Sequence, residues 1–330
     1  MPRRLNLLSV VAPMFNEEGT VREFYARVTT ALQGLNYELI LVDDASGDRT
    51  PELLDDLAAT DPRVRVIYLS RNFGHQAALT AGLEHARGDA VVMLDGDLQD
   101  PPELIATMLE RWQEGYEVVY GQRTRREGET KAKLATSRWF YRLFARVTGL
   151  DLAQNAGDFR LLDRRALDAL LSLPERNRFL RGMTVWIGFK QTPVSYEREP
   201  RHAGETKYTW RKMVHFAVDA ISSFSLMPLQ LATLLGFVFS IVAFLALPLV
   251  IVARIAHIYV PGVSTILFVI LFLGGIQLIT VGLIGEYVGR IYEEVKGRPL
   301  YLVRDRRNVG PEEPRSGGGD ASEPERAIAP

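Results

Sequence analysis

Two long stretches without a charged residue constrain this chain more than any other feature. Residues 220–253 and 255–285 contain no Asp, Glu, Lys or Arg, and Arg254 separates them. A helix of about 20 mostly apolar residues crosses the hydrocarbon core of a bilayer. Burying two such helices in a soluble core would require far more polar chain to cover them. The sequence therefore predicts two transmembrane helices, at about 229–253 and 264–285.

The basic residues near these predicted spans are distributed unevenly. The connection between the spans offers only Arg254. Before the first span and after the second lie Lys207, Arg211, Lys212, Arg290, Lys296, Arg298, Arg304, Arg306 and Arg307. Cytoplasmic loops carry an excess of Lys and Arg, so we expect a multi-pass protein of the cytoplasmic (inner) membrane with both termini and the domain of residues 1–225 in the cytoplasm. Residues 226–289 would form the membrane segment, 290–309 a cytoplasmic juxtamembrane segment, and 310–330 a disordered low-complexity tail.

Residues 5–122 alternate between short strand-like runs and stretches with helical spacing of apolar residues. The strand candidates are Leu7–Ala12, Glu38–Asp43, Val64–Leu69, Ala90–Leu94 and Glu117–Tyr120. The helix candidates between them are Glu18–Leu32, Thr50–Ala59, Gln76–Ala86 and Pro102–Glu114. This alternation is typical of an α/β domain with a mostly parallel sheet and helices on both faces. Ligands of such sheets bind beyond the carboxyl ends of the strands.

Composition and missing motifs exclude several classes of function. The net charge of -1 gives no reason to expect a nucleic-acid partner. The chain has no cysteine, so it has no disulfide, thiolate metal site or catalytic thiol. No G-x-G-x-x-G follows the first predicted strand, and neither G-x-x-x-x-G-K-[ST] nor G-x-S-x-G occurs. A dinucleotide oxidoreductase and a P-loop NTPase are therefore disfavoured, and a hydrolase elbow is missing.

Polar clusters rich in acidic residues follow the first, second and fourth predicted strands. They are Asn16-Glu17-Glu18, Asp43-Asp44-Ala45-Ser46-Gly47-Asp48 and Asp95-Gly96-Asp97-Leu98-Gln99-Asp100. Any one of them could be only a helix cap or a turn, but three at one sheet edge bring carboxylates together, and a divalent cation relieves their repulsion. Asp95 and Asp97 are therefore the candidate site for Mg²⁺ or Mn²⁺, which would stabilise a departing pyrophosphate. Strand order places Asp44 and Glu17 where they could hydrogen-bond a base or ribose.

An ordered series of segments carries a family resemblance. The segments are Ala12–Glu17, Val42–Ser46, Arg71–Gln76, Leu94–Pro102, Gly157–Leu161, Gly204–Tyr208 and Gly285–Tyr292. Together they resemble family 2 glycosyltransferases of the GT-A fold, over residues 7–303. The form Asp-x-Asp-Leu-Gln-x-Pro-Pro is similar to the polyprenyl-phosphate branch of that family, which includes dolichol-phosphate mannose synthases and bacterial undecaprenyl-phosphate glucosyltransferases.

The resemblance implies roles for residues that match the family's motifs. Nucleotide binding is implied for Pro13, Phe15, Glu17, Val42, Asp44, Asp95 and Gly96, the first five of which match positions that hold the nucleoside. Metal binding is implied for Asp95, Asp97 and Gln99. Phosphate binding is implied for Arg123, Arg138, Arg201 and Lys207, and a catalytic role for Asp95, Asp97, Asp158 and Arg123. Each basic residue could instead be a solvated surface charge, an alternative that weighs most for Arg138.

Asp158 needs separate treatment because an inverting transferase usually employs a carboxylate base. The acceptor implied here is a phosphate monoester, whose second pKa is about 6, so it is already nucleophilic near neutral pH. We therefore predict that Asp158 positions groups in the site more than it removes a proton. The alternative is that it only pins the segment around Arg160.

Two stretches mix basic and large apolar residues as interfacial helices do. Residues 131–148 include Trp139, Phe140, Leu143 and Phe144, and residues 209–224 include Trp210, Met213, Val214 and Ile221. We expect both stretches to lie on the bilayer and to hold the site at headgroup level. Packing against the soluble domain is the alternative.

The expected reaction is an inverting, metal-dependent transfer of a sugar to undecaprenyl or another polyprenyl phosphate, giving a lipid-linked sugar for the cell envelope. The donor is a nucleotide sugar, with UDP-glucose first among those that share these motifs. A processive polysaccharide synthase would carry Q-x-x-R-W, but Met108 precedes Arg111-Trp112 and Ala135 precedes Arg138-Trp139 at the glutamine position. A non-catalytic membrane scaffold or transporter subunit is the remaining alternative. The resemblance also allows a homo-oligomer such as a tetramer.

Overall fold

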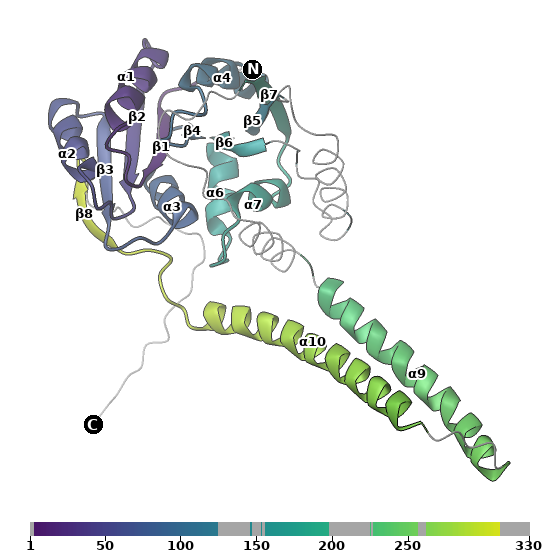
Figure 1. Cartoon of the computed structure of the whole chain (residues 1–330). Coiled ribbons are helices and arrows are strands. Elements are labelled where there is room, and N and C mark those ends of the chain that lie inside the picture. The colour runs from purple at the N-terminus through teal and green to yellow at the C-terminus, as the bar shows by residue number, and fades with distance from the viewer. Residues whose placement is uncertain are drawn as a thin grey trace, which may run out of the picture.

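The structure is a computed structural model whose described residues are 3–124, 146, 153, 156–197, 225, 227–256 and 262–310. Within them, a sheet covered by helices forms one domain, from which two long helices extend (Figure 1). Outside the described residues lie the predictions for Arg138, Arg201, Lys207, residues 131–148 apart from Arg146, residues 209–224 and the tail from residue 311.

The sheet has eight strands in the order β7-β5-β6-β4-β1-β2-β3-β8. Their bounds are β1 (Leu8–Met14), β2 (Tyr37–Asp43), β3 (Val64–Leu69), β4 (Ala90–Met93), β5 (Val118–Arg123), β6 (Ala156–Asp163), β7 (Gln191–Tyr196) and β8 (Val303–Arg307). Neighbours among β1 to β4 are parallel, and so are β5 and β7. β6 and β8 run antiparallel to the strands beside them. The prediction of a mostly parallel sheet is confirmed for the first four strands, but the whole sheet is mixed because β6 and β8 come from segments where no strand was predicted.

Helices cover both faces of the sheet. One layer contains α1 (Val21–Ala31), α2 (Thr50–Thr60), the 3₁₀ turn η1 (Pro102–Leu104) and α4 (Ile105–Gln113). The other contains α3 (His75–His85), α6 (Arg164–Ser172) and α7 (Leu180–Trp186). Successive strand residues alternate between the layers, so Val10 packs in the first and Val11 in the second. Continuous burial of β2, β3 and β4 is typical of strands covered on both faces.

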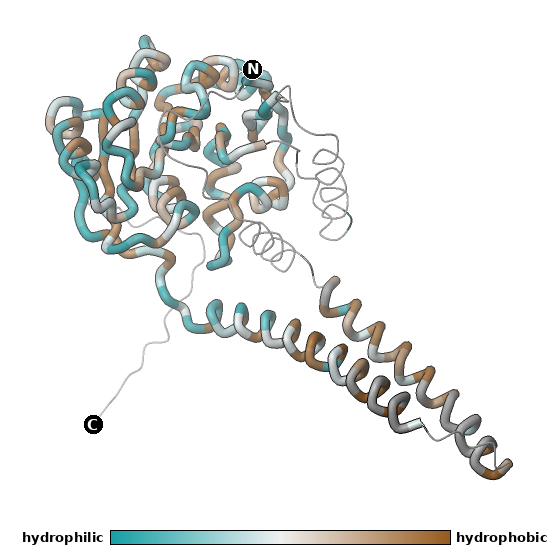
Figure 2. The backbone as a smooth tube through the Cα atoms, viewed as in Figure 1, coloured by the Kyte–Doolittle hydropathy of each residue, from teal (hydrophilic) through white to brown (hydrophobic). Residues whose placement is uncertain are grey.

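The two apolar stretches form α9 (Met227–Ile255) and α10 (Val263–Val295), which run antiparallel to each other away from the sheet (Figure 1). Apolar residues predominate along both helices (Figure 2). Phe239 and Phe272 make an edge-to-face contact with ring centroids 6.2 Å apart. Among the described side chains, Phe272–Val295 is the segment long and apolar enough to cross a membrane, and α9 contributes the shorter apolar stretch Leu229–Val242.

After α10 the chain returns to the sheet as β8 (Figure 1). β8 pairs with β3 and forms the edge of the sheet opposite β7. Just before it, the carbonyl oxygen of Leu302 accepts a hydrogen bond from the Ser70 amide at 2.8 Å. Just after it, Asn308 Nδ2 donates to the carbonyl oxygens of Ala58 at 2.7 Å and Val64 at 2.8 Å. The segment that follows the apolar helices is therefore part of the domain.

Candidate active site

The loops at the carboxyl ends of β1, β2 and β4 lie at one edge of the sheet, and each contains a non-glycine residue with positive φ. These are Asn16 (+55°), Ala45 (+59°) and Leu98 (+60°). Asn tolerates this region because of its short polar side chain, but Ala and Leu do not have that help. Backbone strain of this kind is concentrated at functional sites. The three strained loops are the ones in which the sequence predicted a site.

The β1–α1 and β2–α2 loops are fastened to each other by side chains. The Asn16 amide donates to Ser46 Oγ at 2.9 Å, and Asn16 Oδ1 accepts from the Gly47 amide at 2.8 Å. The Glu17 amide donates to Thr50 Oγ1 at 2.8 Å. Because these bonds run between the loops, they hold the two loops in one fixed arrangement at the sheet edge.

The residues predicted to bind a nucleoside are placed at different depths. Phe15 is 46% exposed just beyond β1, and Pro13 and Glu17 are half-buried beside it. Val42, by contrast, is fully buried in the core, and Asp44 is 3% exposed. An exposed aromatic ring gives a planar base a surface for stacking. Phe15, the most exposed of these residues, is therefore the one best placed to stack on a base.

Asp44 holds the loop that follows β3. Its Oδ1 accepts the Phe73 amide at 2.7 Å, and its Oδ2 accepts the Gly74 amide at 2.9 Å. Both bonds are charge-assisted and therefore stronger than neutral ones. Gly74 has φ +95°, which suits glycine, and it leads the chain into α3. The loop thereby brings His75, the first residue of α3, toward the site. The sequence did not predict that Asp44 would hold this loop.

The loop after β4 carries the predicted metal-binding residues. The Gln99 amide donates to Asp97 Oδ1 at 3.1 Å, which closes a tight turn. A Cβ added at Gly96 would lie 2.5 Å from Met14 Sδ and 3.2 Å from the carbonyl oxygen of Pro13. Glycine at this position therefore lets the loop lie directly against the end of β1.

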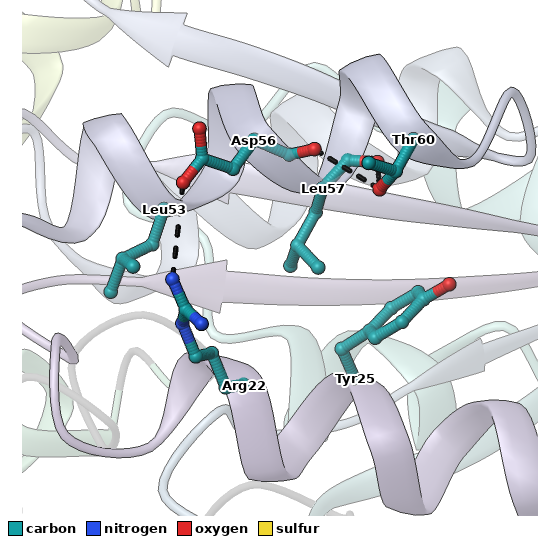
Figure 3. A pocket seen from close by; sticks show the side chains of 6 residues that line it. All are labelled: Arg22, Tyr25, Leu53, Asp56, Leu57 and Thr60. Carbon is teal, nitrogen blue, oxygen red and sulfur yellow. Dashed lines mark hydrogen bonds and ion pairs between the residues drawn. The ribbon is translucent and has the colours of Figure 1, made fainter.

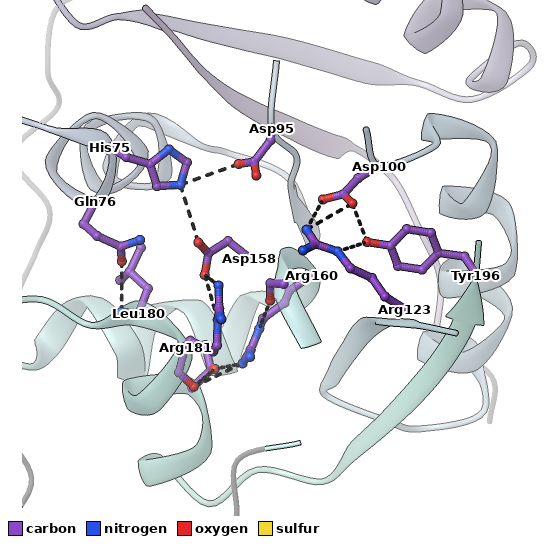
Figure 4. A network of polar contacts seen from close by, with 12 residues as sticks. His75, Gln76, Asp95, Asp100, Arg123, Asp158, Arg160, Leu180, Arg181 and Tyr196 are labelled. Atoms are coloured by element: carbon purple, nitrogen blue, oxygen red, sulfur yellow. Dashed lines mark hydrogen bonds and ion pairs between the residues drawn. The ribbon is translucent and has the colours of Figure 1, made fainter. Parts of the chain in front are cut away.

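Asp95 and Asp158 face each other where β4 and β6 adjoin. Met93 pairs with Arg160, so continuing this antiparallel register by two residues places Asp95 opposite Asp158. Like charges at opposite positions of neighbouring strands are destabilising. His75 lies between them, with Nε2 3.5 Å from Asp95 Oδ1 and 3.6 Å from Asp158 Oδ2 (Figure 4).

Asp158 has a second partner in Arg181 of α7. The Arg181 Nε and Nη2 atoms lie 3.3 Å and 3.2 Å from Asp158 Oδ1 (Figure 4). Burial would raise the pKa of Asp158, but the contact with His75 and the charge of Arg181 hold it well below its usual range. A carboxylate with so low a pKa is a weak base at neutral pH. The low pKa of Asp158 therefore favours positioning over proton removal.

Negative charge is concentrated around Asp95. Burial, together with the carboxylates of Asp158, Asp100 and Asp97, raises the pKa of Asp95 to about 6 against the lowering effect of His75. Desolvation would lower the pKa of His75, but its contact with Asp158 and the charge of Asp95 leave that pKa raised. A cation at this place would relieve the repulsion between the carboxylates.

The donors of Asp95, Asp97 and Gln99 are oxygen atoms, the ligands that Mg²⁺ and Mn²⁺ prefer. Within the described part of the chain, no group of three or more acidic or histidine side chains lies close enough together to enclose a metal. An open set of donors suits Mg²⁺, which keeps several waters and takes phosphate oxygens as further ligands. The donor chemistry therefore fits such a cation, although the described side chains do not by themselves form a closed metal site.

Asp100, Arg123 and Tyr196 form a buried cluster beside the acidic loop (Figure 4). Arg123 Nε donates to the Tyr196 hydroxyl at 3.1 Å, and its Nη2 lies 3.4 Å from both oxygens of Asp100. The Tyr196 hydroxyl also donates to Asp100, which is 1% exposed and needs such partners.

Arg123 was predicted from the sequence, but its partners were missed. Asp100 could have been found as a third acid in the same motif, whereas nothing in the sequence marks Tyr196.

Replacing Tyr196 with phenylalanine is expected to lower the free energy of unfolding by about 1–3 kcal/mol, because the buried carboxylate of Asp100 loses a donor. Thermal unfolding of the purified full chain in detergent measures the effect. The matched control is Tyr116→Phe, at a half-buried tyrosine that contacts Lys190 through its ring. That change is expected to cost less than about 0.5 kcal/mol. Equal melting temperatures for the two variants would contradict the importance of the Tyr196 hydroxyl.

A groove between α1 and α2 lies apart from these residues (Figure 3). Its volume is about 230 Å³, and its lining residues are Arg22, Tyr25, Leu53, Asp56, Leu57 and Thr60. Arg22 and Asp56 approach to 3.9 Å across it, and both side chains are exposed. None of the predicted site residues lines this groove, so it is not part of the candidate site.

Comparison with known proteins identifies the family. The model of glycosyl transferase family 2 matches residues 9–171. An uncharacterized glycosyltransferase of Synechocystis sp. is 46% identical over 301 residues, which are 90% of this chain and 95% of that protein. A prophage bactoprenol glucosyl transferase homolog of Escherichia coli is 40% identical over 300 residues (90% and 98%), and a bactoprenol glucosyl transferase of Shigella phage SfX is 40% identical over 303 residues (91% and 99%). The chain belongs to glycosyl transferase family 2 and is a glycosyltransferase, which confirms the resemblance.

Proposed function

We propose that this chain transfers glucose, with inversion, from UDP-glucose to bactoprenol (undecaprenyl) phosphate and so makes a lipid-linked glucose for the cell envelope. The observation that carries the proposal is the 40% identity, over 300 residues and 90% of the chain, to a protein named as a bactoprenol glucosyl transferase homolog. The described site supports it. An exposed aromatic ring, an acidic loop and a set of basic side chains meet at the carboxyl edge of the sheet.

The described residues suit different parts of such a reaction. Phe15, just beyond the carboxyl end of β1, offers an exposed stacking surface for the base. Asp95, Asp97 and Gln99 would hold Mg²⁺ or Mn²⁺, which supplies a Lewis acid for the departing diphosphate. Arg123, fixed by Asp100 and Tyr196, would contact the phosphates. The phosphate of the acceptor is already anionic near neutral pH and needs no base to attack the sugar.

The proposal extends to the membrane. α9 has 29 residues and α10 has 33, so at a rise of 1.5 Å per residue each exceeds the roughly 30 Å of a hydrocarbon core. Exposed apolar side chains on both helices, such as Phe244 and Leu278, support two spans, and the basic residues outside the spans would keep both termini in the cytoplasm. Residues 1–225 would then form the cytoplasmic catalytic domain.

Several predictions for residues outside the described part belong to this proposal. Residues 131–148 and 209–224 would lie on the bilayer surface and bring the acceptor phosphate to the site. Arg138, Arg201 and Lys207 would add phosphate contacts to that of Arg123. The working unit would be a homo-oligomer.

Transfer assays with the purified full chain test the proposal. Vesicles containing undecaprenyl phosphate would receive the protein, Mg²⁺ and one labelled donor at a time: UDP-glucose, UDP-N-acetylglucosamine or GDP-mannose. The expected result is a labelled lipid with UDP-glucose, lost in excess chelator. Transfer to water-soluble alcohols alone, or a product that lengthens into a polymer, would overturn the proposal, and the polymer would favour a processive synthase.

Asp158→Asn is expected to lower the transfer rate roughly 10-fold without changing the shape of the rate curve from pH 6 to 8. The depressed pKa of Asp158 keeps its carboxylate ionised throughout that range, so it neither gains nor loses a proton there. The stability that the carboxylate contributes is present above the unfolded pKa of about 3.9 and is lost as the pH falls through the lower folded value. A rising limb that is present in the parent enzyme and absent in the variant would instead identify Asp158 as a base.

A further inference from the structure

His75 is the side chain in the described site whose contacts reach both opposed carboxylates. Its Nε2 atom lies within 3.6 Å of Asp158 and 3.5 Å of Asp95, whereas Arg181 is bonded to Asp158 (Figure 4). The imidazole is also partly open to solvent, with 41% of its side chain exposed. It therefore faces the site from the start of α3 and is not a core histidine.

The geometry of the sheet creates the need for such a bridge. Asp95 follows β4, Asp158 is the third residue of β6 (Ala156–Asp163), and extending the register of these strands by two residues sets the two opposite each other. Carboxylates in this arrangement repel and would push the β4 loop away from β6. A donor placed between them, at similar distances from both, opposes that separation. The bridge thus joins the acidic loop to the carboxylate that lies across from it.

The backbone on which His75 sits is held without help from its own side chain. Asp44 binds the two amides of the preceding loop, at Phe73 and Gly74. On the other side, Gln76 Oε1 accepts the Leu180 amide at 3.1 Å, which ties the start of α3 to the start of α7 (Figure 4). Since these bonds are independent of the imidazole, replacing His75 is expected to change the bridge and leave the fold in place.

We propose that His75 is a positioning residue that sets the separation between Asp95, in the loop for the metal and the donor diphosphate, and Asp158, opposite it on β6. The inference rests on the proposed function, because the separation of the two carboxylates affects turnover only if the donor and the acceptor react beside them. Holding reacting groups at a fixed separation contributes to rate, since small displacements are costly in a bimolecular transfer. The bridge therefore acts on turnover more than on binding of either substrate.

Three substitutions separate this role from a merely structural one. His75→Ala removes the donor, His75→Gln keeps an amide nitrogen near the place of Nε2, and His75→Asn keeps one that is too short to reach it. His75→Ala and His75→Asn are expected to lower kcat about 10- to 100-fold with little change in the KM for UDP-glucose. His75→Gln is expected to recover much of that loss. The matched control is His85→Gln, the same change at the far end of α3, which is expected to leave kcat unchanged.

A double substitution tests whether His75 acts through Asp158. In the Asp158→Asn background the effect of His75→Ala on kcat is expected to shrink several-fold, because the two residues share one interaction. The inference would be overturned if the losses of kcat in the two single variants were fully additive in the double variant. It would also be overturned if His75→Gln lost as much kcat as His75→Ala, or if His75→Ala lost none. Melting temperatures of all variants show whether the fold is kept. If the parent enzyme makes no lipid-linked glucose, the proposed function fails; if it does and the variants match it, only the role of His75 fails.

Discussion

Replacing Asp97 with alanine is expected to reduce transfer on the order of 1000-fold while the protein still folds and reaches the membrane. Asp97 lies in the loop after β4, where its Oδ1 accepts one backbone hydrogen bond, from Gln99 at 3.1 Å. Losing that bond costs about 1 kcal/mol of stability, which a folded domain tolerates. Losing an oxygen donor that stabilises the charge developing on the diphosphate raises the activation barrier by about 3–4 kcal/mol.

The measurement is labelled lipid formed per unit of protein recovered in the membrane fraction. Asp56→Ala is the matched control, since the Asp56 side chain is 72% exposed and its ion pair among the described residues is a long one, 3.9 Å from Arg22. Its activity is expected to equal that of the parent enzyme. Normal turnover by Asp97→Ala would show that the acidic loop does not hold a catalytic cation.

The first half of the fold could be predicted because its signals are local. β1 to β4 are apolar runs, three of which (β1, β2 and β4) are followed by acidic loops, and the helices between them show helical spacing, so each element is visible in its own residues. The strand β6 is different: its Arg160 is a charged residue in the middle of a buried strand. Arg160 is buried because Thr184 and the Arg181 carbonyl, both on α7, accept its hydrogen bonds. That partnership is tertiary and leaves no local pattern.

The same distinction applies to the candidate site. Asp95 and Asp97 were predicted as a cation site because their spacing is combined with two further acidic clusters at the same end of the sheet strands. His75, Arg181 and Tyr196 were missed, since each acquires its role only where α3, α7 or β7 meets the loops of the sheet. A single exposed histidine or arginine has no sequence feature that distinguishes it from a solvated surface charge.

β8 is the clearest case of a strand that exists through its neighbour. Its sequence, Val-Arg-Asp-Arg-Arg, has almost no strand character, and the segment was predicted only as a juxtamembrane stretch. It becomes a strand because the open edge of β3 supplies hydrogen-bond partners. Apolar residues on either side of the charged run then anchor it, since Tyr301, Val303 and Val309 pack against the core layer that contains α3.

Ending the chain at Leu300 is therefore expected to lower the free energy of unfolding of the domain by roughly 3–5 kcal/mol, because these partly buried apolar side chains and the pairing with β3 are lost together. Transfer activity is expected to fall at least about 10-fold. The truncation removes the Leu302 carbonyl from Ser70, at the start of the loop that ends at His75, and the Tyr301 hydroxyl from Glu84 of α3. Both contacts lie on the elements that present His75 to the site.

The matched control ends the chain at Gly310, which keeps β8 and Asn308 and removes only the tail that was predicted to be disordered. Thermal unfolding and lipid-linked sugar formation are measured for both truncations in the same membranes. Because the chain up to Leu300 retains α9 and α10, membrane recovery is expected to be equal, so a lower activity is attributable to the domain. If the Leu300 truncation melts and turns over like the Gly310 truncation, β8 contributes neither stability nor support for the loop that carries His75.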